Sequence, residues 1–167
     1  INRNEQARVE ERTNHFIRLA NEIFESKFPE IPIYFNLKGR SSGMYTVRGR
    51  ARGLGAGKAN KQRRDIRYNP WIFAGHFDEC MAVTVPHEVA HYVVDMLYGM
   101  KNVRPHGREW KCVMAAFGAD ARVTANMSLE GIPKRTSTYV NYRCGCGDQK
   151  MGIRRHHKVV RGEAWYS

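Results

Sequence analysis

The stretch "VPHEVAHYVV" (residues 85–94) contains the residue types of a catalytic metal site. His87 and His91 stand four residues apart, and Glu88 lies between them. Residues at this spacing lie on one face of a helix about one turn apart, so both imidazoles can reach one ion. A glutamate directly after the first histidine can reach a metal-bound water and act as its general base. The pattern therefore predicts metal-assisted hydrolysis, with two surface histidines on an ordinary helix as the alternative.

A catalytic zinc ion needs a third ligand, because it takes three protein ligands and keeps a fourth position open for water. His106 follows His91 by fifteen residues, after a connection that contains Gly99 and Pro105. We expect the chain to turn back there, so that His106, at the head of the next helix, approaches the same ion. An exposed histidine at a helix end is the alternative. Glu109 is a competing ligand, or a residue that orients a ligand histidine through a hydrogen bond.

Hydrophobic periodicity predicts the elements that position these residues. In residues 4–28 the apolar residues recur at spacings of three, four and seven, which predicts an amphipathic helix that ends at Pro29. Apolar and polar residues alternate in residues 31–37, which predicts a half-buried strand. A turn into a second strand is expected over 38–47, and a short third strand over 65–70. The first part of the chain thus predicts a helix followed by a small sheet.

Two further helices are expected at residues 78–100 and 106–118. Pro86 lies inside the first of them, so that helix is either kinked there or begins anew with Pro86 in its first turn. After Pro133 the composition changes to short runs of Tyr, Val, Arg, Cys and Gly, which predicts small strands in a separate module. No apolar run approaches the length of a membrane-spanning helix, so no membrane partner is expected.

The net charge of +12 is concentrated in two segments. Residues 48–67 and residues 134–161 each hold eight Lys and Arg against one Asp, and the rest of the chain has a net charge of −2. This clustering favours a surface that faces a polyanion over a generally basic protein. Solvated loops without a partner are the alternative.

"VPHEVAH" and, further on, "RPHGREW" resemble the metal-binding motifs of the SprT-like metalloproteases. "KGRSSG" followed by "DIRYNP" resembles the family's strand pair ahead of the metal helix, and "YRCGC" with "IRRHHKVVRGEAWY" resembles the zinc-binding tail of its bacterial members. The resemblance implies an α+β fold in two parts. Residues 1–133 would form a zincin-like metalloprotease domain with a small sheet packed on helices, and residues 134–167 a short, β-rich, partial zinc ribbon.

The same resemblance implies a zinc metalloendopeptidase of the zincin (gluzincin) type. His87, His91 and His106 match the ligand positions of one catalytic Zn²⁺, and Glu88 matches the general base. A nucleic-acid-binding module with a structural zinc site and no peptidase activity is the alternative. That alternative has no need of Glu88, and a structural site usually carries four protein ligands.

Eukaryotic members of this family cleave proteins cross-linked to DNA and are stimulated by DNA. The expected partners are therefore DNA, single-stranded or structured, and the proteins bound to it. Four cysteines are too few for a disulfide framework, which favours a reducing compartment, here the cytoplasm or nucleoid. The candidate DNA contacts are Arg48, Arg50, Arg52, Lys58, Lys61, Arg63, Arg64, Arg154, Arg155, Lys158 and Arg161.

Cys144 and Cys146 form a C-x-C pair that leaves a second zinc site incomplete. The resemblance implies a second cysteine pair, and two cysteines alone would hold zinc weakly. Three explanations compete: a chain that continues beyond Ser167, a degenerate ribbon, or a structural site completed by His156 and His157. We favour the first; a second, structural Zn²⁺ is expected only if the tail is completed in this way.

Overall fold

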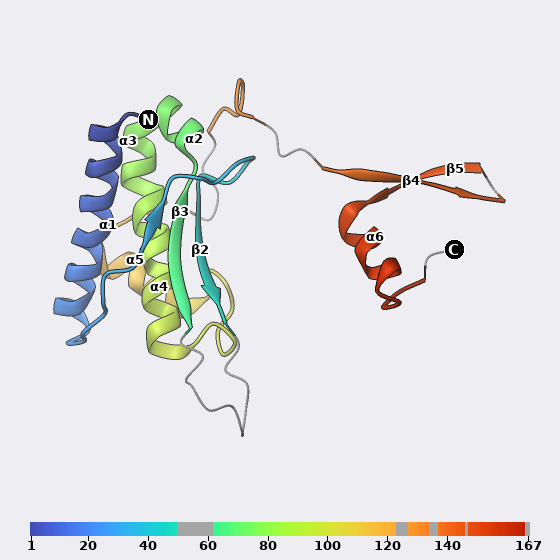
Figure 1. Ribbon diagram of the computed structural model, residues 1–167. Helices are drawn as coiled ribbons and strands as arrows, with labels where there is room; N and C mark the ends of the chain where they lie inside the picture. The colour runs from blue at the N-terminus through green and yellow to red at the C-terminus, as the bar shows by residue number, and fades with distance from the viewer. Residues whose placement is uncertain (50–61, 123–126, 134–136, 146, 166–167) are drawn as a thin grey trace. The chain divides into compact units, whose positions relative to one another are not determined.

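Figure 1 shows the computed structural model of the chain, which describes residues 1–49, 62–122, 127–133, 137–145 and 147–165. The chain divides into two compact units, Ile1–Pro133 and Lys134–Ser167. Each unit contains both helix and strand, so the class is α+β as predicted. Among the described residues, no helix has the length and apolar character to cross a membrane.

Helix α1 spans Arg3–Ile23 and begins with a capping box. The Asn2 side chain accepts a hydrogen bond from the Glu5 backbone N–H at 2.9 Å, and the Glu5 carboxylate accepts one from the Asn2 N–H at 2.8 Å. The helix is shorter than the predicted 4–28, because the Asn21 side chain bonds the backbone N–H and C=O of Phe28 and turns the chain back. Its buried stripe consists of Val9, Thr13, Phe16, Ile17 and Ala20.

The first unit contains a three-stranded sheet with the order β1-β3-β2. Strand β1 (Ile33–Tyr34) pairs parallel with β3 (Arg63–Tyr68), and β2 (Gly43–Arg48) pairs antiparallel with β3. Strand β1 is much shorter than the predicted 31–37. The alternating sequence correctly reflects alternating burial, which extends along residues 31–40. Strand pairing with β3 forms only at Ile33 and Tyr34, so most of this segment is extended but not a strand.

The register of β2 and β3 gives the sheet two different faces. We call the face that packs on helix α4 (Val85–Tyr98) the inner sheet face. Its residues are Gly43, Tyr45, Val47, Arg64, Ile66 and Tyr68. The opposite face is the outer sheet face, with Met44, Thr46, Arg48, Arg63, Asp65 and Arg67 from these two strands.

Three short helical segments lead into α4: α2 (Pro70–Gly75), α3 (Phe77–Glu79) and a π-helical turn (Cys80–Thr84). Pro86 lies in the first turn of α4, as in the second predicted arrangement, but α4 follows the π turn without a break in the helical backbone. Proline has no N–H to donate and crowds the carbonyl four residues back. The wider π turn ahead of it lets the chain continue as one helical run.

Helix α4 is the centre of the first unit, because it contacts α1, α5 (Arg108–Ala116) and the inner sheet face (Figure 1). Its apolar residues are buried from Val85 to Val94, whereas Met96, Leu97 and Tyr98 at its end are exposed. Two hydroxyl groups near this helix have partners. The Tyr92 hydroxyl donates to the Pro29 carbonyl at 2.8 Å, and the Tyr68 hydroxyl lies 2.9 Å from that of Thr13. The catalytic-type motif is therefore carried by the most firmly packed helix of the unit.

The second unit consists of a β-hairpin and a helix. Strands β4 (Tyr139–Cys144) and β5 (Gly147–Gly152) pair antiparallel, and small strands were predicted here from the composition. Helix α6 (Ile153–Val160) follows, and it was not predicted. The proposed second zinc site falls outside the description, because it depends on Cys146 and on the side chain of Cys144.

Candidate metal centre

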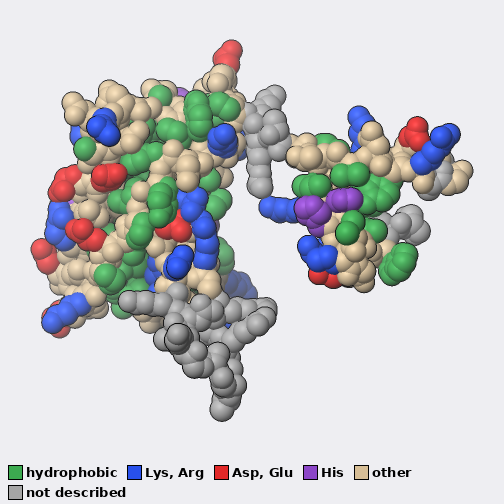
Figure 2. Space-filling model, viewed as in Figure 1, with side chains coloured by type: hydrophobic (Ala, Val, Ile, Leu, Met, Phe, Trp, Pro, Cys, Tyr) green, Lys and Arg blue, Asp and Glu red, His purple; other side chains and the backbone are tan. Residues whose placement is uncertain are grey.

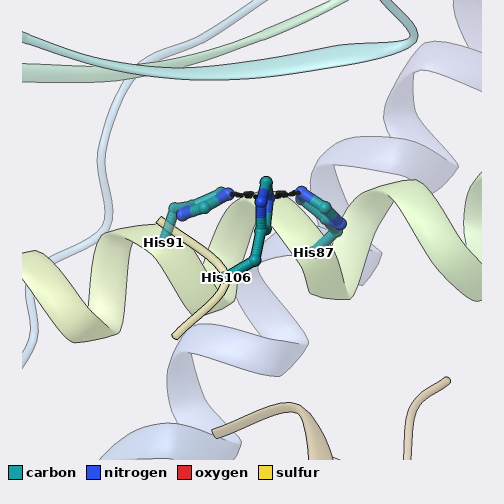
Figure 3. Close-up of side chains that lie close together, drawn as sticks. All are labelled: His87, His91 and His106. Carbon is teal, nitrogen blue, oxygen red and sulfur yellow. Dashed lines mark hydrogen bonds between the residues drawn. The ribbon is translucent and has the colours of Figure 1, made fainter. Parts of the chain in front are cut away.

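Three imidazoles converge on one point at the surface of α4 (Figure 3). The Nε2 atom of His91 lies 3.2 Å from that of His87 and 3.1 Å from that of His106, and the remaining pair is 3.0 Å apart. Helix α4 carries the first two at i and i+4, as predicted. His106 comes from the turn that precedes α5, so the fold brings the predicted third residue to the same point.

The turn before α5 directs the His106 side chain toward the other two imidazoles, and His106 adopts an unusual backbone conformation there. His106 has φ 55°, in the left-handed region that non-glycine residues seldom occupy. The next residue, Gly107, donates its N–H to the Arg104 carbonyl at 2.9 Å, and a Cβ on it would stand 2.9 Å from that oxygen. The predicted helix start at His106 is therefore wrong by two residues: a tight turn, and not helical backbone, directs this side chain.

Trp110 packs beneath the three imidazoles. Its ring centroid lies 4.8 Å from those of His87 and His106 and 5.8 Å from that of His91. Its Nε1–H also points at the His87 carbonyl, at 3.4 Å. Because Trp110 is buried, it fixes the orientation of all three rings and keeps water from one side of them.

The surroundings of all three imidazoles lower their pKa and so favour the neutral form. Burial, then the nearby His106, lowers the pKa of His87 to about 4, although a hydrogen bond with the Arg122 backbone acts in the opposite direction. Burial, then the other two rings, lowers the pKa of His91 to about 3, and burial lowers that of His106. Neutral imidazoles offer the lone pairs that metal binding requires.

The arrangement fits a tetrahedral metal ion with one open position. Ligand atoms about 2.0–2.1 Å from a tetrahedral zinc ion stand roughly 3.3–3.4 Å from one another. The observed separations of 3.0–3.2 Å are close to this value, and three lone pairs held so near together would otherwise repel. Among the described residues, this trio is the one group of three or more His, Cys, Asp or Glu side chains placed to hold a metal ion, and Glu109 is not part of it.

Glu88 is buried against strand β2, with 7% of its surface exposed. Its Oε2 accepts a hydrogen bond from the Tyr45 backbone N–H at 2.7 Å. Burial raises the pKa of Glu88 to about 8, and the Tyr45 N–H partly opposes this by stabilising the carboxylate. The carboxyl group is therefore positioned by one backbone donor and has a raised affinity for a proton.

Gly43 leaves the space that Glu88 occupies. A Cβ on Gly43 would stand 2.6 Å from Cγ of Glu88, 2.7 Å from its Oε1 and 2.8 Å from Cγ2 of Thr84. These distances are too short for any side chain, so β2 approaches α4 this closely only because residue 43 is glycine. The sequence offered one signal, a glycine at the start of a predicted strand, which marks a close approach.

A second link joins β2 to α4 through the side chain of Tyr45. The Tyr45 hydroxyl donates to Oδ2 of Asp95 at 2.8 Å, and Nε of Arg64 donates to the same oxygen at 2.7 Å. Asp95 is buried on α4, seven residues after Glu88 and thus on the same face. Sequence reasoning missed Asp95, although a carboxylate within an apolar helix was a usable signal.

The candidate DNA contacts fall into four groups. Arg48 and Arg63 are exposed on the outer sheet face, whereas Arg64 lies on the inner face and is bound by Asp95. Arg64 is therefore set apart from the surface candidates, because alternation along a strand points adjacent residues to opposite faces. The tail candidates Arg154, Arg155, Lys158 and Arg161 are exposed on or just after α6, and Arg50, Arg52, Lys58 and Lys61 lie outside the described residues.

A sequence model described as the SprT-like family matches residues 13–130 of the chain. The chain belongs to the SprT-like family. That match contains the three histidines, Glu88 and both strands that approach α4. The family resemblance predicted from the motifs is confirmed.

Relatives within the SprT-like family cover most of the chain. Protein SprT of Vibrio parahaemolyticus is 38% identical over 152 residues, covering 90% of this chain and 81% of that protein. Protein SprT of Shewanella oneidensis is 33% identical over 162 residues, covering 96% and 92% respectively. Protein SprT of Salmonella newport is 40% identical over 116 residues, covering 69% and 67%. No solved structure gave a significant match.

Proposed function

We propose that this chain is a zinc-dependent endopeptidase that acts on proteins bound or cross-linked to DNA. The observation that carries the proposal is the convergence of His87, His91 and His106 on one point of the helix that also holds buried Glu88. Three neutral imidazoles suit zinc among the common metals, and three protein ligands leave a position for water. A purely structural site would not need a carboxylate next to its ligands.

Zinc bound there would lower the pKa of its water and polarise the scissile carbonyl. Glu88 takes the water proton and later delivers it to the leaving amine. Its Oε2 accepts a hydrogen bond from the Tyr45 N–H, which favours one orientation of the carboxylate while it accepts and releases that proton. The three imidazoles keep their orientation because Trp110 packs against each of them.

The association with DNA is supported by the charge distribution. The two basic segments hold all the excess positive charge of the chain. Arg48 and Arg63 on the sheet, and the exposed cations of α6, carry part of that charge on both units. A polyanion attracted to these surfaces would concentrate its bound proteins near the metal centre.

The function is tested by cleavage of a DNA-binding protein with and without its DNA. We expect cleavage to require metal, to stop on addition of a zinc chelator and to be faster when DNA is present. Metal-dependent cleavage at the same rate with and without DNA would support an ordinary peptidase instead. DNA binding without cleavage of any substrate would support the nucleic-acid-binding module with a structural zinc ion.

Gly43→Ala is expected to lower kcat by about a hundredfold or more, because its new methyl group displaces the Glu88 carboxylate. Misplacing a catalytic group by about 1 Å can cost this much. The matched control is Gly75→Ala, since a Cβ at Gly75 meets nothing within 4 Å. Both variants should keep wild-type metal content by elemental analysis. Equal activity of the two variants would show that the close approach of β2 does not position Glu88.

A further inference from the structure

The outer sheet face lies opposite the face of β2 and β3 that packs on α4. The extensive helix contacts of β2 and β3 are those with α4, which covers the inner face. Two large apolar side chains are exposed on the outer side: Tyr34 at 43% and Met44 at 42%. Figure 2 shows Lys and Arg side chains gathered along the strands of the first unit. A sheet face that combines exposed rings with cations suits a ligand with both anionic and flat apolar parts.

The segment after β1 extends this face. Burial alternates along residues 31–40, and Tyr34, Asn36 and Lys38 are the exposed members of its central part. Backbone bonds hold the segment beside β3: the Ile66 N–H donates to the Pro32 carbonyl at 3.0 Å, and Leu37 N–H to the Tyr68 carbonyl at 3.1 Å. The exposed side chains are therefore presented by ordered backbone, next to those of β3.

Arg67 is fixed at the centre of the face. Its Nε donates to Oδ1 of Asp65 at 2.7 Å, and its Nη1 donates to Oδ1 of Asn36 at 3.1 Å. The guanidinium also lies over the Tyr34 ring, 5.1 Å from the centroid. Asp65 is the one acidic residue of the two strands on this face, and it is buried beneath its arginine partners.

A pair of cations marks the other end of the strands. Arg48 and Arg63 are opposite one another in the β2–β3 register, and both are exposed. Arg67 lies four positions after Arg63 on β3, which places their backbones about 13 Å apart. Positive charge therefore extends along the whole length of the strands.

A second exposed ring stands at the end of the extended segment. Trp71 is 40% exposed, and Nζ of Lys38 lies 5.8 Å from its ring centroid. Asn69 fixes this corner: its side chain accepts from the Trp71 N–H at 3.1 Å and donates to the carbonyls of Gly39 and Ser41. Tyr34 and Trp71 thus each combine a solvent-facing ring with a cation held against it.

We propose that the outer sheet face, with Tyr34, Lys38 and Trp71 at its margin, binds single-stranded nucleic acid. Cations spaced along the strands would neutralise phosphates, and exposed rings would stack on unpaired bases. A duplex hides its base faces, so the rings favour a single strand. An acidic peptide would use the cations but not the rings. The inference rests on the DNA association of the proposed function and assigns it a surface.

The surface is tested by fluorescence anisotropy of the full-length chain with a labelled 20-nucleotide oligo-dT and with a duplex of equal length. We expect Tyr34→Ala to weaken oligo-dT binding by about fivefold or more and to leave duplex binding unchanged. The double variant Arg48→Gln/Arg63→Gln should reduce the slope of log affinity against log salt by about 1.4 for oligo-dT. The charge-matched control is Arg3→Gln/Lys27→Gln, which removes two exposed cations from other elements.

Equal weakening by the control pair would overturn the proposal, because total charge and not this surface would then govern binding. Oligo-dT affinity unaffected by Tyr34→Ala, or competition by poly-glutamate as strong as by oligo-dT, would overturn it as well. The binding measurement needs no catalysis, so it is independent of the peptidase assay. If the chain cleaves casein but the surface variants bind oligo-dT as the wild type does, the proposed binding surface is refuted and the peptidase function is not. If the surface variants show the expected changes in binding but the wild-type chain cleaves no substrate, the peptidase function is refuted and the binding surface is not.

Discussion

Glu88→Gln is expected to lower kcat by about 10²- to 10⁴-fold while the chain keeps its full metal content. Glutamine has nearly the same shape, and its carbonyl oxygen can still accept the hydrogen bond from the Tyr45 N–H that Oε2 accepts now. It cannot take a proton from water at any physiological pH. The variant therefore removes the proton acceptor and leaves the space, the backbone contact and the three imidazoles in place.

The measurement pairs single-turnover cleavage of a DNA-bound protein with elemental analysis of the metal. Glu109→Gln is the matched control, because this glutamate lies in the neighbouring helix α5 but outside the histidine cluster. The control should cleave at close to the wild-type rate. Cleavage by Glu88→Gln at that rate would remove Glu88 from the mechanism, and a loss of metal in this variant would make its role structural.

The histidine pair and the general base were predictable because they depend on one local period. Residues four apart share a helix face wherever the helix lies, so "HEVAH" determines their relation without further folding. His106 needed more. The spacing suggested a return of the chain, but the position of its ring depends on a left-handed backbone angle and on the Arg104–Gly107 turn. The motif therefore identified His106 as a ligand candidate, whereas the fold determines where its imidazole points.

The strand contacts of Glu88 could not be predicted from sequence in the same way. Gly43 and Tyr45 are more than forty residues away, and they meet α4 only because β2 pairs with β3 in one register. A shift of that register by one residue would turn Met44 toward Glu88 and expose Tyr45. The same dependence on register explains why Arg64 was predicted from the sequence as a surface cation. In the structure it lies on the inner sheet face, where it pairs with Asp95.

His106→Asn is expected to weaken zinc binding by roughly 100- to 1,000-fold. Structural zinc sites bind with about 10–16 kcal/mol at neutral pH, so each of a few ligands contributes about 3–4 kcal/mol. Asparagine tolerates the left-handed backbone that His106 adopts, so the turn before α5 should survive the change. Its shorter side chain removes the imidazole from the cluster, and His87 and His91 alone would bind as an ordinary helical pair.

Thermal unfolding with and without zinc measures this loss directly. Zinc at 100 times the wild-type Kd should stabilise the wild-type chain by about 2.7 kcal/mol, and a variant with hundredfold weaker binding by only about 0.4 kcal/mol. His15→Asn is the control, since His15 is exposed on α1 and outside the cluster, and it should keep the full zinc response. A full zinc response in His106→Asn would reduce the site to two histidine ligands. It would also remove the geometric ground for an open tetrahedral position, because a third protein ligand would then have to come from elsewhere.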